Sequence, residues 1–293
     1  MAEFYKIKVT RDSPADHIYH SSDWHVGDTN TDDKDADELV RRLNHSPPGP
    51  IFLPGDMGRW FPLTHRHAAY DEITGSPYPT PALQMERIGD ILDSIEEHIN
   101  PRFLGMGNHE KSIFKQAGNL YTDGGFCEQH GLNYAGVVCF VAFDYGKGRL
   151  LHTCTAHGMG RIGYQAKSPP GLGLRYKANA ALAVRDKLGN LDKGASDLYA
   201  MGHTHFLDKF VPPTIRQLVN NGKHLEKREV RECYITKPVV AINTGSLCKA
   251  FPPCRETYQE ESMYGACDIG YVDTHINWED GAWCLRPDLI HID

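Results

Sequence analysis

Short apolar runs separated by helical patterns are the feature of this sequence that most restricts its fold. Eight runs have the length and composition of strands, and several of them end in glycine or in polar residues. Alternation of such runs with helical segments is typical of α/β layers. The predicted strands are residues 17–22, 50–55, 102–107, 136–143, 149–156, 197–202, 238–245 and 269–276.

One helix has a clear periodic pattern. Between residues 82 and 99, isoleucine and leucine recur at steps of three and four, so that one stripe of the helix is apolar. This pattern indicates packing against a core. Weaker helical patterns occur at about residues 33–45 and 176–189.

No charge run or linker in the sequence divides the chain into independent domains. Its 293 residues can bury a sizeable core. We therefore predict a single domain over residues 1–293, with loop insertions at about 57–81 and 158–175. Both insertions are rich in proline and glycine and lack periodicity, as binding loops often do.

The composition argues against several classes of protein. A net charge of -7 and a pI near 6.1 are unlike those of a protein that coats nucleic acid through a broad basic face. The sequence starts without an apolar signal region and contains no uninterrupted apolar stretch that could cross a bilayer, so we expect a cytoplasmic location and no membrane partner. The eight cysteines include no CxxC spacing and are expected to be free thiols.

Side chains that can bind metal follow five of the predicted strands. In an extended segment, residues i and i+2 point to the same face. Parallel strands also present their carboxyl ends at one edge of a sheet. The sequence therefore predicts that two carboxylates, one amide oxygen and four imidazoles converge, with one further histidine beside them. In chain order these residues are Asp23, His25, Asp56, Asn108, His109, His157, His203 and His205.

This mixture of oxygen and imidazole ligands predicts a particular kind of metal site. It suits Mn, Fe, Zn or Co, whereas a closed structural zinc site would favour thiolates. It also contains more ligands than one ion needs, so two ions about 3.5 to 4 Å apart would share it. Such a pair polarises phosphoryl oxygens and lowers the pKa of bound water. Hydrolysis of a phosphoester is the chemistry that the set favours.

In their order, these motifs resemble those of the calcineurin-like metallophosphoesterase superfamily, which are DxH, GD, GNH[DE], H and GHxH. The resemblance covers residues 17 to about 246, because an asparagine and glycine turn also follows the last motif. The matching segments are Asp23-Trp24-His25, Gly55-Asp56, Gly107-Asn108-His109-Glu110, His157, Gly202-His203-Thr204-His205 and Asn243-Thr244-Gly245-Ser246.

The resemblance implies a four-layer α/β/β/α sandwich with the active site at the strand ends. It implies that one ion is held by Asp23, His25, Asp56 and His205. Asp56 would bridge to a second ion, held also by Asn108, His157 and His203. The family's cofactors would be two divalent ions, with Mn²⁺ as the first choice and Fe, Zn, Co, Ni or Mg as alternatives. A hydroxide between the ions would attack phosphorus in line, and His109 would stabilise the transition state or protonate the leaving oxygen.

The sequence also departs from one branch of the superfamily. Phosphoprotein phosphatases carry an aspartate three residues after the GD aspartate, where this chain has Arg59. That difference argues against a phosphoprotein phosphatase, although GNHE matches the branch. The stretches HGMGRIG and TGSLCKAF look more similar to phage and prophage phosphoesterases, which would place the protein in a host cytoplasm. Arg59 and Arg161, in the long loops, are candidates to clamp a phosphate.

The predicted function is that of a dinuclear metal-dependent phosphodiesterase acting on a nucleotide or nucleic-acid phosphoester. Two alternatives are a phosphomonoesterase or phosphoprotein phosphatase, and a non-catalytic binding or scaffold protein of the same fold. Loss of a metal ligand or of the catalytic histidine would favour the scaffold, and all of these residues are present. The sequence assigns no role to Glu110 and no oligomeric state.

Overall fold

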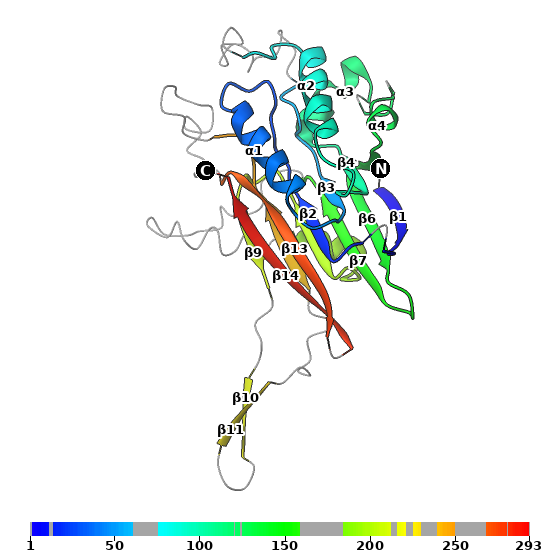
Figure 1. The fold of residues 1–293 in the computed structure, drawn as a ribbon, viewed down its shortest axis with the longest axis vertical. Helices are drawn as coiled ribbons and strands as arrows, with labels where there is room; N and C mark the ends of the chain where they lie inside the picture. The colour runs from blue at the N-terminus through cyan, green and yellow to red at the C-terminus, as the bar shows by residue number, and fades with distance from the viewer. Residues whose placement is uncertain are drawn as a thin grey trace.

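One large β-sheet with helices around it forms the fold in a computed structural model of the chain (Figure 1). The prediction of a mixed α/β fold is confirmed. The structure describes residues 2–11, 14–60, 76–119, 121–123, 125–158, 184–211, 216–220, 225–229, 239–249, 268–279 and 281–292.

Twelve of the described strands belong to the large sheet, in the order β14-β13-β2-β3-β4-β5-β1-β6-β7-β8-β12-β9. Each of the eight predicted strands overlaps one of them. Two more strands, β10 (Arg216–Asn220) and β11 (Leu225–Glu229), pair separately. The bounds in the large sheet are β1 (Ala2–Lys8), β2 (His17–His20), β3 (Ile51–Leu53), β4 (Arg102–Gly105), β5 (Asn133–Gly136), β6 (Val138–Asp144), β7 (Leu150–Ala156), β8 (Leu198–Met201), β9 (Leu207–Phe210), β12 (Val240–Thr244), β13 (Gly270–Glu279) and β14 (Ala282–His291).

In the sheet, β1 connects one half, the six strands from β14 to β5, with the other half, the five strands from β6 to β9. On one side β1 meets β5 at a single pair, Ala2 with Gly136, and on the other it pairs with β6 over its whole length. In one half β2, β3 and β4 are parallel neighbours, and in the other β7, β8 and β12 are. Each half therefore brings several carboxyl ends of strands to one edge.

Three hydrophobic clusters fill the space around the strands. The first packs the apolar stripes of two helices against one face of β2 to β4. The second contains side chains from both halves of the sheet, and the rings of Phe52 and Phe143 meet edge to face there, with centroids 6.4 Å apart. The third joins β7, β8 and β12 to Val184 and Leu188, which lie in a helical segment at 184–192.

The two helices of the first cluster are α1 (Asp33–Asn44) and α2 (Pro81–Asp93), and they agree with the predictions except at one end. The prediction that α2 continues to residue 99 is wrong. Helix α2 ends after Asp93 because the side chain of Asn44 binds the backbone that follows: its amide donates to the Ser94 carbonyl and its oxygen accepts from the Glu96 N–H. Ile95 and Ile99 are still buried in the first cluster, so the apolar pattern predicted burial correctly beyond the helix.

The remaining helices are α3 (Asn108–Ala117) and α4 (Phe126–Gln129), which lie near α2 at the top of the view in Figure 1. Of the helix predicted at 176–189, the described part is helical from 184. The central parts of both predicted loop insertions lie outside the described residues. The described free cysteines are Cys127, Cys139, Cys154, Cys248 and Cys284. None of the described helices has the length and apolar character needed to span a membrane.

Candidate metal centre

All seven predicted metal ligands stand where strands of the large sheet end. Asp23 and His25 follow β2, and Asp56 follows β3. Asn108 is the first residue of α3, directly after β4. His157 follows β7, and His203 and His205 lie between β8 and β9. The sequence predicts Asn108 at the end of a strand, whereas in the structure Asn108 begins helix α3.

The backbone at these positions is unusual. Five of the seven ligands have left-handed conformations, with φ from 49° to 69°. Non-glycine residues rarely adopt this region, and they cluster at functional sites because the surrounding structure must hold them there. The five are Asp23, His25, Asp56, His203 and His205.

Two glycines, each directly before a predicted ligand, permit the close approach of the loops that carry Asp56 and Asp23. A Cβ atom on Gly107 would lie 2.0 Å from Oδ1 of Asp56, and one on Gly202 would lie 2.7 Å from Oδ2 of Asp23. Both distances are far below van der Waals contact. Any side chain at either position would displace a predicted ligand.

The first group of ligands is Asp23, His25 and His205, whose ligand atoms all lie within 4.8 Å of one another. Nε2 of His205 is 3.2 Å from Oδ1 of Asp23 and 3.2 Å from Nε2 of His25. Oδ2 of Asp23 accepts hydrogen bonds from Ser22 and from the backbone N–H of His203. Oδ1 is buried and has no hydrogen-bond partner among the described residues. Because a buried carboxylate oxygen needs a partner, Oδ1 is well suited to bind a cation.

The second group is Asp56, His157 and His203, with Asn108 beside it. Nε2 of His157 is 3.0 Å from Oδ2 of Asp56 and 3.1 Å from Oδ1 of Asn108. Asp56 also belongs to a third group, with His25 and His109. The Asp56 carboxylate therefore lies between the two sets of imidazoles, where a bridging ligand would stand.

The charges of these groups depend strongly on one another. Burial alone would raise the pKa of Asp56, but the imidazoles of His157 and His109 hold that pKa well below its usual range. Burial would lower the pKa of His157, yet the carboxylates of Asp56 and Asp23 raise it to about 9. Burial lowers the pKa of His203 to about 4. In the absence of a cation, a proton on His157 thus compensates the buried carboxylates.

Metal binding is expected to release this proton. Since the pKa of His157 is raised to about 9, the imidazole is protonated below that pH and must lose its proton to bind an ion. Affinity should therefore fall by about tenfold per pH unit as the pH drops below 9, for the one proton displaced. Titration calorimetry of Mn²⁺ binding in two buffers of different ionisation enthalpy measures the release. An identical heat in both buffers would contradict the expectation.

His109 lies beside Asp56 and is partly accessible. Its side chain is 18% exposed, and its Nε2 is 3.8 Å from Oδ2 of Asp56. Its Nδ1 is 2.9 Å from the backbone carbonyl of Arg59, so Nδ1 carries the hydrogen and the ring orientation is fixed. The backbone at position 59 thus orients the histidine, although the side chain there is not the aspartate of phosphoprotein phosphatases.

The structure describes one of the two arginines that are predicted to clamp a phosphate. The guanidinium of Arg59 pairs with Asp28, and its side chain is only 12% exposed. Its role toward substrate remains a prediction. Arg161 lies outside the described residues.

Glu110, which the sequence left without a role, is a buried acceptor that joins three segments of the site. Each of its oxygens accepts from backbone N–H groups next to the predicted ligands, and Oε1 also accepts from an indole and a phenol. The donors are the N–H groups of Asp56, Met57 and Gly107, Nε1 of Trp60 and the hydroxyl of Tyr121, at 2.7 to 3.0 Å. Burial and the charge of Asp56 raise the pKa of Glu110, while the bonds from Trp60 and Tyr121 lower it. Glu110 therefore positions Asp56 and the start of α3 without facing the metal groups itself.

Replacing Glu110 by Gln is expected to lower the free energy of unfolding by about 2 to 4 kcal/mol. The amide group would point a donor at existing donors, and each buried polar group left without a partner costs about 1 to 3 kcal/mol. Urea denaturation of the metal-free protein measures the change, with the exposed Glu128→Gln as the control. A loss below about 0.5 kcal/mol, as for an ordinary surface substitution, would contradict this role.

Comparison with known proteins gives no family for the chain. No family model matches it, and no curated protein matches it. Among solved structures, it aligns with Vps29 from Cryptosporidium parvum (12% identity, 94% of this chain and 98% of that chain, TM-score 0.36). It also aligns with Vps29 from Chaetomium thermophilum (13% identity, 94% and 96%, TM-score 0.35).

A further solved structure is wild-type Vps29 in complex with Zn²⁺ from Entamoeba histolytica (14% identity, 93% of this chain and 98% of that chain, TM-score 0.37). TM-scores this low carry no argument about what this chain binds or does. The case for a metal centre therefore rests on the groups of histidine and aspartate side chains in this structure.

Proposed function

We propose that this protein is a dinuclear metal-dependent phosphohydrolase, most specifically a phosphodiesterase that acts on a nucleotide or nucleic-acid phosphoester. The observation that carries the proposal is the place of Asp56. Its carboxylate belongs to two of the three groups at the strand ends, and a carboxylate has two oxygens with which to bridge two cations.

The proposed architecture is a four-layer α/β/β/α sandwich. Three separate hydrophobic clusters support it: one between α1, α2 and the sheet, one shared by both halves of the sheet, and one beneath the helical segment at 184–192. The same architecture would bring both sets of strand ends to the proposed metal centre. Membership of the calcineurin-like metallophosphoesterase superfamily is part of this proposal.

The residues fit two divalent ions. Asp23, His25 and His205 would hold one ion, Asn108, His157 and His203 the other, and Asp56 both. The ions would supply positive charge to the phosphoryl oxygens and a water molecule of lowered pKa. Mn²⁺ is the first choice because oxygen and imidazole ligands are mixed, and Fe, Zn, Co, Ni and Mg are alternatives.

His109 would act on the substrate rather than on the ions. Its ring is held by the carbonyl of Arg59 and keeps Nε2 on the side of Asp56. From that position Nε2 can donate a proton to the leaving oxygen or a hydrogen bond to a phosphoryl oxygen. The partial exposure of the ring leaves room for a substrate to approach.

Two other functions use the same residues differently. A phosphomonoesterase or phosphoprotein phosphatase would need a site that accepts a phosphate with two free charges. A binding or scaffold protein of this fold would hold the ions without turnover, and the ligand groups alone are equally compatible with it. His109, with its oriented ring beside the bridging carboxylate, is the feature that favours an enzyme.

An assay with added Mn²⁺ separates the three functions. We expect faster hydrolysis of a bis-aryl phosphate than of the corresponding mono-aryl phosphate. Preference for the monoester would support the second candidate. No hydrolysis of either ester by protein shown to contain two ions would support the scaffold. Cyclic nucleotides, dinucleotides, single-stranded DNA, RNA and phosphopeptides would then identify the substrate class.

A further inference from the structure

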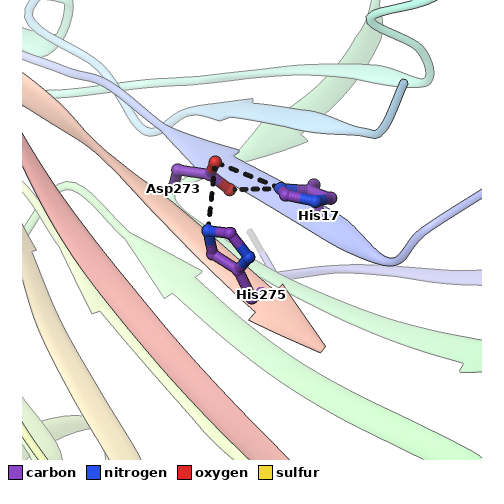
Figure 2. A group of neighbouring side chains, drawn as sticks. All are labelled: His17, Asp273 and His275. Carbon is purple, nitrogen blue, oxygen red and sulfur yellow. Dashed lines mark hydrogen bonds and ion pairs between the residues drawn. The ribbon is translucent and has the colours of Figure 1, made fainter. Parts of the chain in front are cut away.

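A second cluster of histidine and aspartate side chains lies at the opposite end of β2 from Asp23. His17 is the first residue of β2, and Asp273 and His275 lie in the middle of β13. None of the three belongs to the strand-end groups. Figure 2 shows the carboxylate of Asp273 between the two imidazole rings.

The pairing of the strands brings these side chains together. In the antiparallel pair β2–β13, His275 is opposite His17 and Asp273 is opposite Tyr19. Side chains two residues apart point to the same face of a sheet, so His17, Asp273 and His275 share one face. On the other side of β13, Asp288 of β14 is opposite Asp273 and shares that face as well.

The distances between the polar atoms are close to those between ligands of one ion. Nδ1 of His17 is 3.0 Å from Oδ1 and 3.1 Å from Oδ2 of Asp273. Nε2 of His275 is 3.6 Å from Oδ2 of Asp273 and 3.1 Å from Oδ2 of Asp288. A tetrahedral zinc ion, with ligands at about 2.0 to 2.2 Å, sets neighbouring ligand atoms roughly 3.3 to 3.6 Å apart.

The cluster is also accessible and has the right charge. The side chains of His17, Asp273 and His275 are 17%, 13% and 40% exposed, and that of Asp288 is 58% exposed. An ion can therefore enter from solvent, while His17 and Asp273 are held by the sheet. Arg286 of β14 is opposite His275 and shares this face, and its guanidinium is paired with the carboxylate of Glu279, 3.3 Å away. Two carboxylates thus face two imidazoles, a set that balances one divalent cation when both rings are neutral.

We propose that His17, Asp273 and His275, whose ligand atoms all lie within 4.8 Å of one another, form a separate site for one divalent transition-metal ion, with zinc preferred. Two imidazoles and one carboxylate are ligands that zinc accepts, and the carboxylate of Asp288, 3.1 Å from Nε2 of His275, adds negative charge beside them. The ion would tie together β2 and β13. Because β2 leads directly to Asp23, it would also fix the strand that carries the first ligands of the strand-end centre.

The site is tested by counting zinc in the full chain after equilibrium dialysis, for the wild type and for His275→Gln. His275 is 40% exposed, so its replacement is expected to leave the fold intact. The matched control is His152→Gln. His152 also lies in a strand, is 42% exposed and is 3.9 Å from the carboxylate of Asp197, but it belongs to none of the described metal-binding groups.

We expect His275→Gln to bind one zinc ion fewer per chain than the wild type, and His152→Gln to bind the same number. The same difference of one ion between His275→Gln and His152→Gln is expected when both are made in an Asp56→Asn background, so the result does not depend on the strand-end centre. Equal zinc content in His275→Gln and the wild type would overturn the proposal. So would a zinc anomalous difference map of the wild-type crystal without a peak between His17 and His275.

Discussion

Replacing His109 by Ala is expected to lower the turnover of an aryl phosphodiester by about 10² to 10⁴, the usual contribution of general acid–base catalysis, while both metal ions remain bound. The reason is geometric. His109 lies beside Asp56 but belongs to neither proposed set of ligands. The Arg59 carbonyl orients its ring, with Nε2 3.8 Å from Oδ2 of Asp56.

The loss should depend on the leaving group. If His109 protonates the leaving oxygen, an unsubstituted phenyl ester should lose more activity than a nitrophenyl ester, whose leaving group needs no proton. His130→Ala is a suitable control, because His130 is a similarly buried imidazole that pairs with Asp93 away from the centre. Unchanged turnover in His109→Ala, with its metal content intact, would refute the catalytic role.

Replacing Asp56 by Asn should lower both metal content and rate. The amide keeps the shape of the side chain but loses the negative charge and one of the two oxygens that can bridge. Loss of an outer partner of a metal ligand alone costs about 10 to 100-fold in affinity or activity, so loss of the bridging carboxylate should cost at least as much. Plasma mass spectrometry and the diesterase assay measure the two effects.

Asp197→Asn provides the matched control for Asp56→Asn. Asp197 is a buried aspartate like Asp56, and it lies directly before β8. Its Oδ2 accepts a hydrogen bond from the backbone N–H of His152. It belongs to none of the described metal-binding groups. This variant should retain its ions. Two ions per chain at full occupancy in Asp56→Asn would contradict the bridge.

The sequence predicts that several of these ligands converge, because each of them follows an apolar run with the length and composition of a strand. Strand ends of parallel neighbours share one edge, so the positions of Asp23 and Asp56 along the chain predict that they lie together. His157 follows β7 in the other group of strands, and its contact with Asp56 depends on how the two groups pack. Three apolar residues of β3, Ile51 to Leu53, suffice to place Asp56. The side-chain chemistry then restricted the ligand to a cation.

Other features depend on contacts that no local pattern reports. Glu110 lies two residues after the predicted ligand Asn108, but its partner Trp60 is 50 residues away in the sequence, and no local pattern predicts that contact. The end of α2 is set by Asn44 of a different helix. β14 contains a proline, which central strands avoid, and it lies at the edge of the sheet. The cluster of His17, Asp273 and His275 depends on the register of β2 with β13, and no local pattern in the sequence predicts that register.

Anomalous diffraction from crystals grown with Mn²⁺ tests the dinuclear centre most directly. The proposal predicts two manganese peaks about 3.5 to 4 Å apart, with the carboxylate of Asp56 in contact with both. Asp23, His25 and His205 should surround one peak, and Asn108, His157 and His203 the other. A single peak, or two peaks that do not share Asp56, would contradict it.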